Sequence, residues 1–184
     1  DQHHTKGWHP TGIFGAIGAS AACASLRGLD AEQAAHAIAL GASQSAGLTA
    51  NFGTMTKPFH AGRAAHSGVM AARLAAQGFT AALDALEHPQ GFLAAVSPAG
   101  RFDVESPLEG AWKWRMPKSG LSVKKYPMCF ATHRALDGVL DLLKATPLDA
   151  RRVRRVTVSI SRRNIKILRN RSPQTALEAK FSMQ

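Results

Sequence analysis

Small and apolar residues recur every three or four positions along the first half of the chain, which is the spacing of helices with one buried face. The pattern predicts three helices, from about Thr11 to Gly28, from Asp30 to Gly47 and from Pro58 to Gly78. Alanine, glycine and serine dominate them, so their axes can approach closely and form one tightly packed layer. The residues expected to face the core in the third helix are Ala61, Ala65, Val69, Ala72 and Ala76.

Residues suited to helix ends support these three predictions. Thr11 is the expected N-cap of the first helix, and Asp30 with Gln33 has the spacing of a capping box at the start of the second. Pro58 suits the first position of the third helix, because its fixed φ is helical and its missing N–H would have no partner there. Gly78 is the expected end of that helix.

The composition changes after residues 97–100, Ser-Pro-Ala-Gly, which predict a turn. Two short helical pieces, 81–86 and 90–96, precede the turn, and prolines and tryptophans follow it while alanine becomes scarce. We therefore expect residues 1–99 to be part of an all-helical domain and residues 100–184 to be part of a smaller α+β domain.

The second half of the chain contains both the three-to-four-residue spacing of helices and the alternating pattern of strands. Residues 121–126 and 153–160 predict strands, the second by its alternation of valine and isoleucine with threonine and serine. Helices are expected from Thr132 and after Pro173, and the last pattern reaches Gln184 without a stop signal. The fold class is therefore mainly α with an α+β part, both domains incomplete, in a chain that we expect to belong to a longer protein.

Basic residues outnumber acidic ones, 23 to 12, for a formal net charge of +11. Nine of these 23 lie between Arg151 and Arg171, where we expect a solvated surface. A nucleic-acid-binding module is the competing class, but a single tyrosine and scattered aromatics offer no stacking platform and no recognition motif is present. No apolar run approaches the ~18 residues of a membrane span. We expect a cytoplasmic protein that binds neither nucleic acid nor membrane.

Cations gather where the third helix is expected to start. Lys57, His60 and Arg63 lie there, although a helix N-terminus carries partial positive charge and favours acidic residues. The chain has no acidic residue between Gln33 and Leu83 that could neutralise them. An anionic ligand would explain the pattern, because backbone N–H groups and basic side chains would converge on it. A solvated basic helix end is the alternative, and the charges alone do not separate the two.

The same pattern occurs at two other helix starts. His9 precedes the first helix, where a packed loop histidine is the simpler interpretation. Lys124, Lys125, His133 and Arg134 lie around the helix expected from Thr132, and no acidic residue occurs between Glu109 and Asp137. This second group is either a basic surface or another helix end that faces an anion.

Four segments together carry a family resemblance. They are Gly7-Trp8-His9-Pro10-Thr11-Gly12, residues 51–62 (NFGTMTKPFHAG), Lys124-Lys125-Tyr126-Pro127 followed by Thr132-His133, and residues 178–182 (EAKFS). In order and separation they resemble the MmgE/PrpD family, which includes 2-methylcitrate dehydratases, cis-aconitate decarboxylases and iminodisuccinate epimerases. The resemblance runs over essentially the whole chain.

The resemblance implies a large all-helical domain joined to a smaller α+β lid domain, usually in a homodimer, with the active site in the cleft between the domains. Carried over by position, His9, Lys57 and Lys124 are the expected catalytic residues. We assign the two lysines to carboxylate binding and charge stabilisation, and His9 to proton transfer. The residues expected to bind substrate or shape the pocket are His60, Arg63 and His133.

The expected activity is that of a hydro-lyase similar to 2-methylcitrate dehydratase, with propionate metabolism as its setting and a small di- or tricarboxylate as substrate. Decarboxylation and epimerisation remain open, as does a catalytically inactive relative. Cys23 and Cys129 cannot supply the usual ligands of an iron–sulfur cluster. The resemblance also implies catalysis without a metal, so we expect no cofactor.

Overall fold

The computed structural model describes residues 2–97, 102–104 and 115–184. The chain divides into two compact units, residues 1–114 and 115–184. Helices make up most of the regular structure in the described residues of both units, which confirms the prediction of a mainly α fold. The boundary expected at residues 99 and 100 lies outside the described residues.

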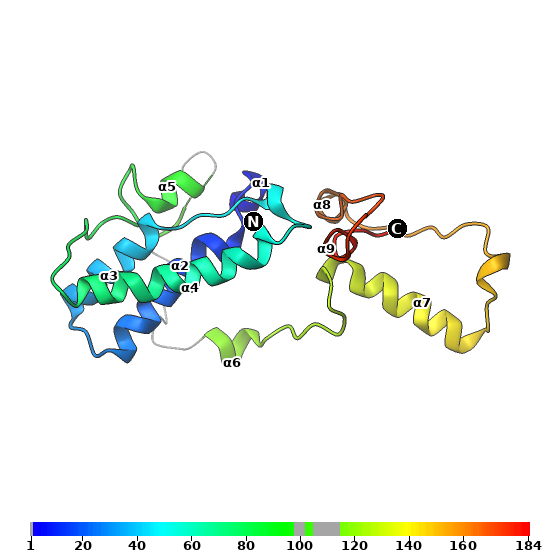
Figure 1. Ribbon diagram of the computed structural model, residues 1–184, viewed down its shortest axis with the longest axis horizontal. Helices are drawn as coiled ribbons and strands as arrows, with labels where there is room; N and C mark the ends of the chain where they lie inside the picture. The colour runs from blue at the N-terminus through cyan, green and yellow to red at the C-terminus, as the bar shows by residue number, and fades with distance from the viewer. Residues whose placement is uncertain (1, 98–101, 105–114) are drawn as a thin grey trace. The chain divides into compact units, whose positions relative to one another are not determined.

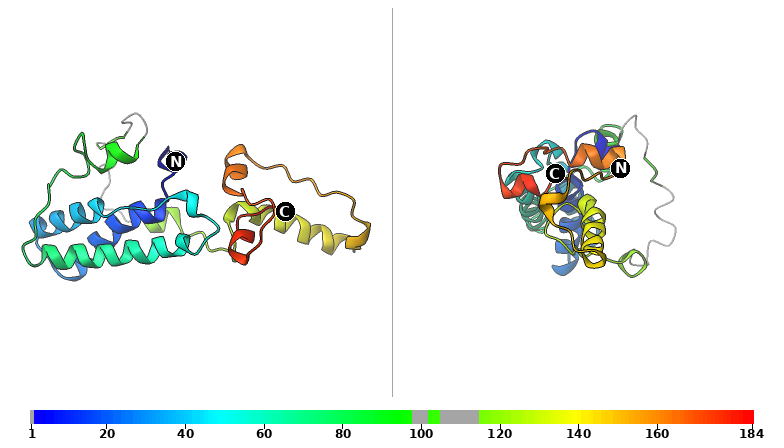
Figure 2. Two further views of the ribbon diagram at one scale, coloured as in Figure 1. Left: turned by 45° about the horizontal axis from the view of Figure 1, so that its top comes forward. Right: turned by 90° about the vertical axis from the view of Figure 1, so that its right-hand side faces the viewer.

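Three long helices form the body of the first unit (Figures 1 and 2). α2 and α4 lie side by side and run in the same direction, and α3 runs the opposite way against both (Figure 1). This is the packed helical layer expected from the sequence. The elements of the unit are α1 (Gln2–Thr5), α2 (Pro10–Leu26), α3 (Ala31–Ser43), η1 (Thr49–Asn51), α4 (Thr56–Ala75) and α5 (Phe92–Val96).

Small side chains make the contacts between these helices. Ala24 of α2, Ala37 of α3, and Ala72 and Ala75 of α4 form a buried apolar cluster. A Cβ added at Gly68 of α4 would collide with the backbone of α2, because the carbonyl carbon of Ala19 would be only 2.6 Å away. The helix axes therefore approach more closely than larger side chains would allow.

The buried face of α4 differs from the predicted one. Ala61, Ala65 and Val69 are exposed, so most of the predicted stripe is wrong. Small residues occur on nearly every side of α4, so hydrophobic periodicity does not indicate which face is buried. The buried face is instead the one whose small side chains let the neighbouring helices approach closely. The buried residues of α4 are His60, Ala64, Ser67, Gly68, Ala71, Ala72 and Ala75.

The predicted caps are partly confirmed. Asp30 accepts from the backbone N–H of Gln33 at 2.8 Å, and both halves of the predicted capping box are present. The prediction of Thr11 as an N-cap is wrong, because Pro10 is already the first helical residue of α2 and His9 is its N-cap. Proline fits that first position for the reason that was expected at Pro58.

α4 begins at Thr56, so Pro58 lies within its first turn and is not its first residue. The helix ends close to the predicted Gly78, whose φ of +82° lies in the left-handed region. The N–H of Gly78 donates to the carbonyl of Ala75 at 3.0 Å, as glycine commonly does after a helix. Beyond it, α5 matches the predicted piece 90–96, whereas residues 81–86 form turns instead of a helix.

The second unit contains α7 as its longest helix, close to the helix predicted from Thr132 (Figure 1). The described residues hold no strand at 121–126 or 153–160, so both strand predictions are wrong for this structure. A segment of alternating apolar and polar residues forms a strand only when a neighbouring strand shares its backbone hydrogen bonds. The described residues contain no such neighbouring strand. The elements are α6 (Arg115–Ser119), η4 (Phe130–Thr132), α7 (His133–Ala145), η5 (Ala150–Arg152), α8 (Arg162–Ile167) and α9 (Ala176–Ala179).

No helix within the described ranges combines the length and apolar character needed to cross a membrane. α4, at 20 residues, is long enough, but basic residues interrupt it.

Candidate functional site

Two buried histidines meet at the N-terminal ends of α2 and α4. His9 is the N-cap of α2 and His60 lies in the second turn of α4, and their Nδ1 atoms are 2.9 Å apart. The side chain of His9 makes no capping hydrogen bond to its own helix. Only 5% of His9 and 8% of His60 is exposed. Two residues 51 positions apart in the chain are thus joined by one buried hydrogen bond.

The loop before η1 covers this pair. The backbone N–H of His9 donates to the carbonyl of Gly47 at 2.9 Å, and Thr49 donates from its N–H to the carbonyl of Gly7 at 2.8 Å. Gly47 has a φ of +133°, and a Cβ there would lie 3.2 Å from the His60 ring. Glycine is therefore needed at position 47 both for its backbone conformation and for the space that it leaves to the imidazole.

Both histidines are held neutral near pH 7. Burial, followed by the positive charge of Lys57 and by His60 and His4, lowers the pKa of His9 to about 4. Burial and then Lys57 also lower the pKa of His60. A neutral imidazole has one N–H donor and one bare nitrogen, so each ring can both donate and accept.

Phe52 and Lys57 complete what we call the paired-histidine cluster, which consists of His9, Phe52, Lys57 and His60. The Phe52 ring meets His9 edge to face, with 4.9 Å between centroids, and the Lys57 Nζ lies 5.1 Å from the Phe52 centroid. The face of an aromatic ring attracts a cation. The cluster thus holds an ammonium group close to two neutral imidazoles.

Arg63 was expected beside these residues but turns along its own helix. Its guanidinium donates to the Ser67 hydroxyl one turn later, and the residue is exposed. The structure therefore brings together three of the four residues expected from the first unit, His9, Lys57 and His60, and leaves Arg63 bonded elsewhere.

In the second unit, Lys124 is exposed and belongs to an irregular segment before η4. Its neighbour Lys125 forms an ion pair with Asp137 of α7, with 2.6 Å between Nζ and Oδ1, and the Tyr126 hydroxyl donates to the same oxygen at 2.7 Å. These contacts lower the pKa of the Asp137 carboxyl, Lys125 being the larger cause. Within this basic group, Lys125 is therefore balanced by an acid, because α7 brings Asp137 back onto it.

His133 begins α7 and is only 5% exposed. Its ring contacts those of Tyr126 and Phe130, with centroids 5.2 and 4.8 Å away. Its Nε2 has no hydrogen-bond partner within the described part of the chain. A buried polar atom of this kind is uncommon and marks His133 as a residue to test.

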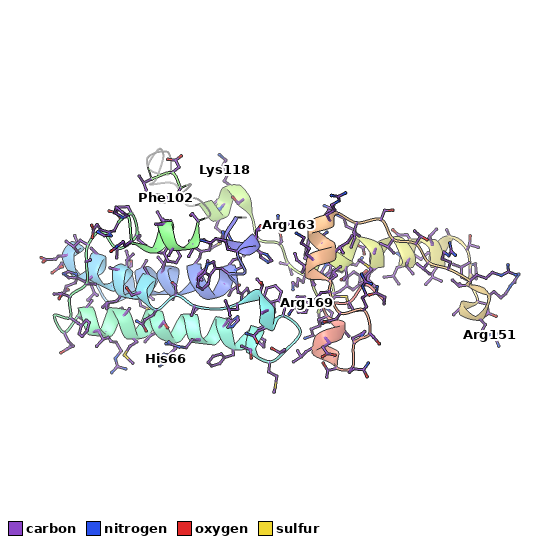
Figure 3. All side chains as sticks on the ribbon, turned by 90° about the horizontal axis from the view of Figure 1, so that it is seen from above. His66, Phe102, Lys118, Arg151, Arg163 and Arg169 are labelled. Atoms are coloured by element: carbon purple, nitrogen blue, oxygen red, sulfur yellow. The ribbon has the colours of Figure 1, made fainter. Side chains whose placement is uncertain are left out.

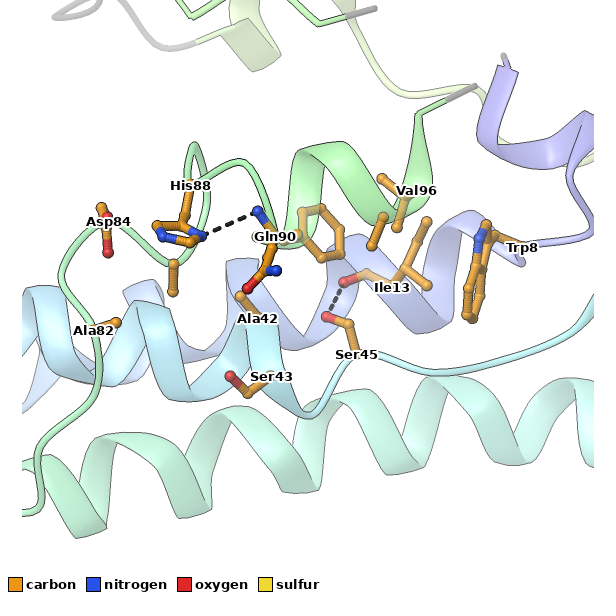
Figure 4. Close-up of a pocket in the computed structure, with 14 residues that line it drawn as sticks. Trp8, Ile13, Ala42, Ser43, Ser45, Ala82, Asp84, His88, Gln90 and Val96 are labelled. Carbon is orange, nitrogen blue, oxygen red and sulfur yellow. Dashed lines mark hydrogen bonds between the residues drawn. The ribbon is translucent and has the colours of Figure 1, made fainter. Parts of the chain in front are cut away.

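A separate cavity of about 490 Å³ opens between α2, the end of α3 and the segment that contains α5 (Figure 4). Trp8, Ile13 and Phe92 give it apolar walls, and Asp84 and His88 add polar groups. His88 accepts from the N–H of Gln90 at 3.0 Å (Figure 4). None of the residues predicted from the sequence as catalytic or substrate-binding lines this cavity.

Residues 2–97, 102–104 and 115–184 contain no group of three or more histidine, cysteine, aspartate or glutamate side chains that could hold a metal ion. The expectation of no cofactor stays a prediction.

Comparison with known proteins matches two family models in the order in which their domains occur. The MmgE/PrpD N-terminal domain matches residues 1–105, and the MmgE/PrpD C-terminal domain matches residues 126–184. The chain belongs to the MmgE/PrpD family. The resemblance stated from sequence motifs is thereby confirmed.

Curated relatives within the MmgE/PrpD family include cis-aconitate decarboxylases of two mammals. The Homo sapiens enzyme is 27% identical over 186 residues, and the Mus musculus enzyme is 28% identical over 188 residues. Each match covers 97% of this chain and 37% of the relative, so the chain spans little more than a third of their length.

Proposed function

We propose that the protein containing this chain is a lyase that acts on a small di- or tricarboxylate. Membership of the MmgE/PrpD family and the similarity to cis-aconitate decarboxylases support a lyase. The single observation that carries the proposal at the level of residues is the paired-histidine cluster, in which neutral His9 lies buried near the cation of Lys57.

The chemistry of such substrates fits these residues. Removing a proton from the carbon next to a carboxylate, or losing CO2 from that carbon, places extra negative charge on a group that is already anionic. A fixed ammonium such as that of Lys57 stabilises this charge, and electrostatic stabilisation of this kind is often the largest catalytic contribution. A neutral histidine can take up a proton at neutral pH and deliver it in a later step, whereas His9 as a permanent cation could not act as the base.

Two reactions are compatible with this arrangement. In a dehydration, a base removes the C–H proton and an acid protonates the leaving hydroxyl, as expected for an enzyme similar to 2-methylcitrate dehydratase. In a decarboxylation, CO2 leaves and an acid protonates the remaining carbon. The mammalian relatives are decarboxylases of cis-aconitate, and this observation favours decarboxylation as the second candidate.

The test is a substrate screen of the full-length protein with methylcitrate, citrate, cis-aconitate and iminodisuccinate. Released CO2 and the appearance or loss of the conjugated double bond separate decarboxylation from dehydration. We expect Lys57→Ala to reduce kcat/KM for the preferred acid by about 10²–10³-fold, the usual effect of removing one charge-stabilising group. Arg73→Ala is the matched control, because Arg73 is an exposed cation near the other end of α4. Turnover within a few-fold of the wild type for Lys57→Ala, with every substrate, would contradict the assignment.

Lys124 is proposed as a second carboxylate-binding residue on the family resemblance alone. We expect Lys124→Ala to raise KM, with Lys118→Ala as its control, since Lys118 is an exposed lysine of the same unit. Equal kinetics for the two variants would remove Lys124 from the site.

A further inference from the structure

The hydrogen bond between His9 and His60 restricts where their protons can lie. With both rings neutral, one Nδ1 must carry a proton and the other must be bare, because two bare nitrogens at 2.9 Å would repel and two N–H groups would clash. The two rings are therefore held in opposite tautomers. Whichever ring donates at Nδ1 has a bare Nε2, and its partner has a protonated Nε2.

Proton transfer at His9 requires His9 to be the donor. An N-cap side chain usually accepts from an N–H of the following turn, but the Nδ1 of His9 is engaged by His60 and makes no such bond with α2. Only when His9 donates at Nδ1 is its Nε2 bare and able to take up a proton. Within the described residues, the bond between the two Nδ1 atoms is the side-chain hydrogen bond of both rings, so no other group competes to set the tautomer.

We propose that His60 is a positioning residue for His9, whose Nδ1–H it accepts, and that this bond keeps the Nε2 of His9 bare and ready to take a proton. The proposal rests on the proposed function only for its kinetic consequence. When the Nε2 of His9 takes a proton from a carbon acid, His9 becomes positively charged. The Nδ1 proton of His9 can then shift along the hydrogen bond to the Nδ1 of His60, which spreads the charge over both rings. His9 then carries its proton on Nε2 and His60 carries two protons. The reverse shift, followed by release of the Nε2 proton of His9 to the leaving group or to carbon, restores both rings.

The groups around the pair explain why a neutral partner is used. Lys57 and His4 are the other titratable groups that act on His9, and Lys57 also acts on His60. A carboxylate in place of His60 would attract Lys57 and raise the pKa of His9. An imidazole orients His9 without placing a negative charge beside the Lys57 ammonium.

Two polar substitutions separate positioning from packing. In His60→Asn, the amide oxygen falls near the place of the histidine Nδ1 and can still accept from His9. In His60→Gln, the amide extends toward the place of Nε2, so the bond is lost although the residue stays polar. His66→Gln is the matched control, because His66 is an exposed histidine on the same helix (Figure 3).

The tautomer can be measured without any substrate, from the imidazole ¹⁵N chemical shifts of the full-length protein labelled at histidine. We expect His9 to be protonated at Nδ1 and bare at Nε2 in the wild type and in His60→Asn, and to become a mixture of tautomers in His60→Gln. A protonated Nε2 in the wild type, or an unchanged His9 tautomer in His60→Gln, would overturn the proposal.

The kinetic measurement is the pH profile of kcat. General acid–base groups contribute about 10²–10⁴-fold to rate, so we expect His60→Gln to lose about 10–100-fold in kcat with a shifted pH profile and little change in KM. His60→Asn should recover most of the kcat that His60→Gln loses, and His66→Gln should stay within a few-fold of the wild type. Equal losses in His60→Asn and His60→Gln would also overturn the proposal. If no carboxylate is turned over by the wild type, the proposed function fails, and the tautomer measurement still decides the role of His60.

Discussion

The close approach of α2 and α4 can be tested with a single methyl group. A Cβ at Gly68 would meet the Ala19 side chain and would lie 2.6 Å from the Ala19 carbonyl carbon and the Ser20 nitrogen. These are backbone atoms, which cannot turn aside as the tip of a side chain can. Reaching an ordinary contact of 3.4 Å would require the helices to separate by about 0.8 Å.

Overpacking of this kind costs about 1–3 kcal/mol, whereas alanine gains only about 0.5–1 kcal/mol over glycine inside a helix. We therefore expect Gly68→Ala to lower the free energy of unfolding by roughly 1–2 kcal/mol. Gly62→Ala is the matched control, because Gly62 is an exposed residue of the same helix and a Cβ there meets nothing within 4 Å. The control should be slightly stabilised by its helix propensity.

Both variants can be compared in urea, with helix content followed by circular dichroism. The midpoint should fall for Gly68→Ala and rise for Gly62→Ala, with unchanged slopes. Two midpoints that move together by the same amount would refute the argument, since helix propensity alone would then explain both. Such a result would mean that the α2 and α4 axes are farther apart than described.

Two further predictions follow from the titration of His9 and the cap of α3. The folded pKa of His9, about 4, lies below its ordinary value of 6.5, so the unfolded chain binds a proton more readily. The stability that a neutral His9 contributes is present above pH 6.5 and is lost as the pH falls to about 4, by roughly 3 kcal/mol. Urea midpoints at several pH values should show a smaller loss in His9→Leu than in His66→Leu, and equal losses would contradict the buried, neutral state of His9. Asp30→Ala removes the capping box of α3 and should cost about 1 kcal/mol in thermal unfolding, with Glu32→Ala as the exposed control. Melting of Asp30→Ala at the wild-type temperature would show that the cap contributes nothing.

Features that depend on neighbours in the chain could be predicted from the sequence alone. The capping box of Asp30 and Gln33, the helix end near Gly78 and the three long helices all follow from the conformational preferences of a few consecutive residues. The family also followed from sequence, because motifs around His9 and Lys57 occur in the expected order. These inferences need no knowledge of how distant segments meet.

Only the tertiary structure determined which faces are buried and which distant residues are in contact. Val69 is exposed while Ser67 and Gly68 are buried, because helices of nearly uniform small residues pack on the face that lets their backbones come closest. The bond between His9 and His60 has no local signal, since 51 residues separate them and only the parallel packing of α2 and α4 aligns their starts. The pattern of residues along the chain indicates the conformational preference of each segment. The buried hydrogen bond between the two histidine rings depends instead on distances that are set only when the helices pack together.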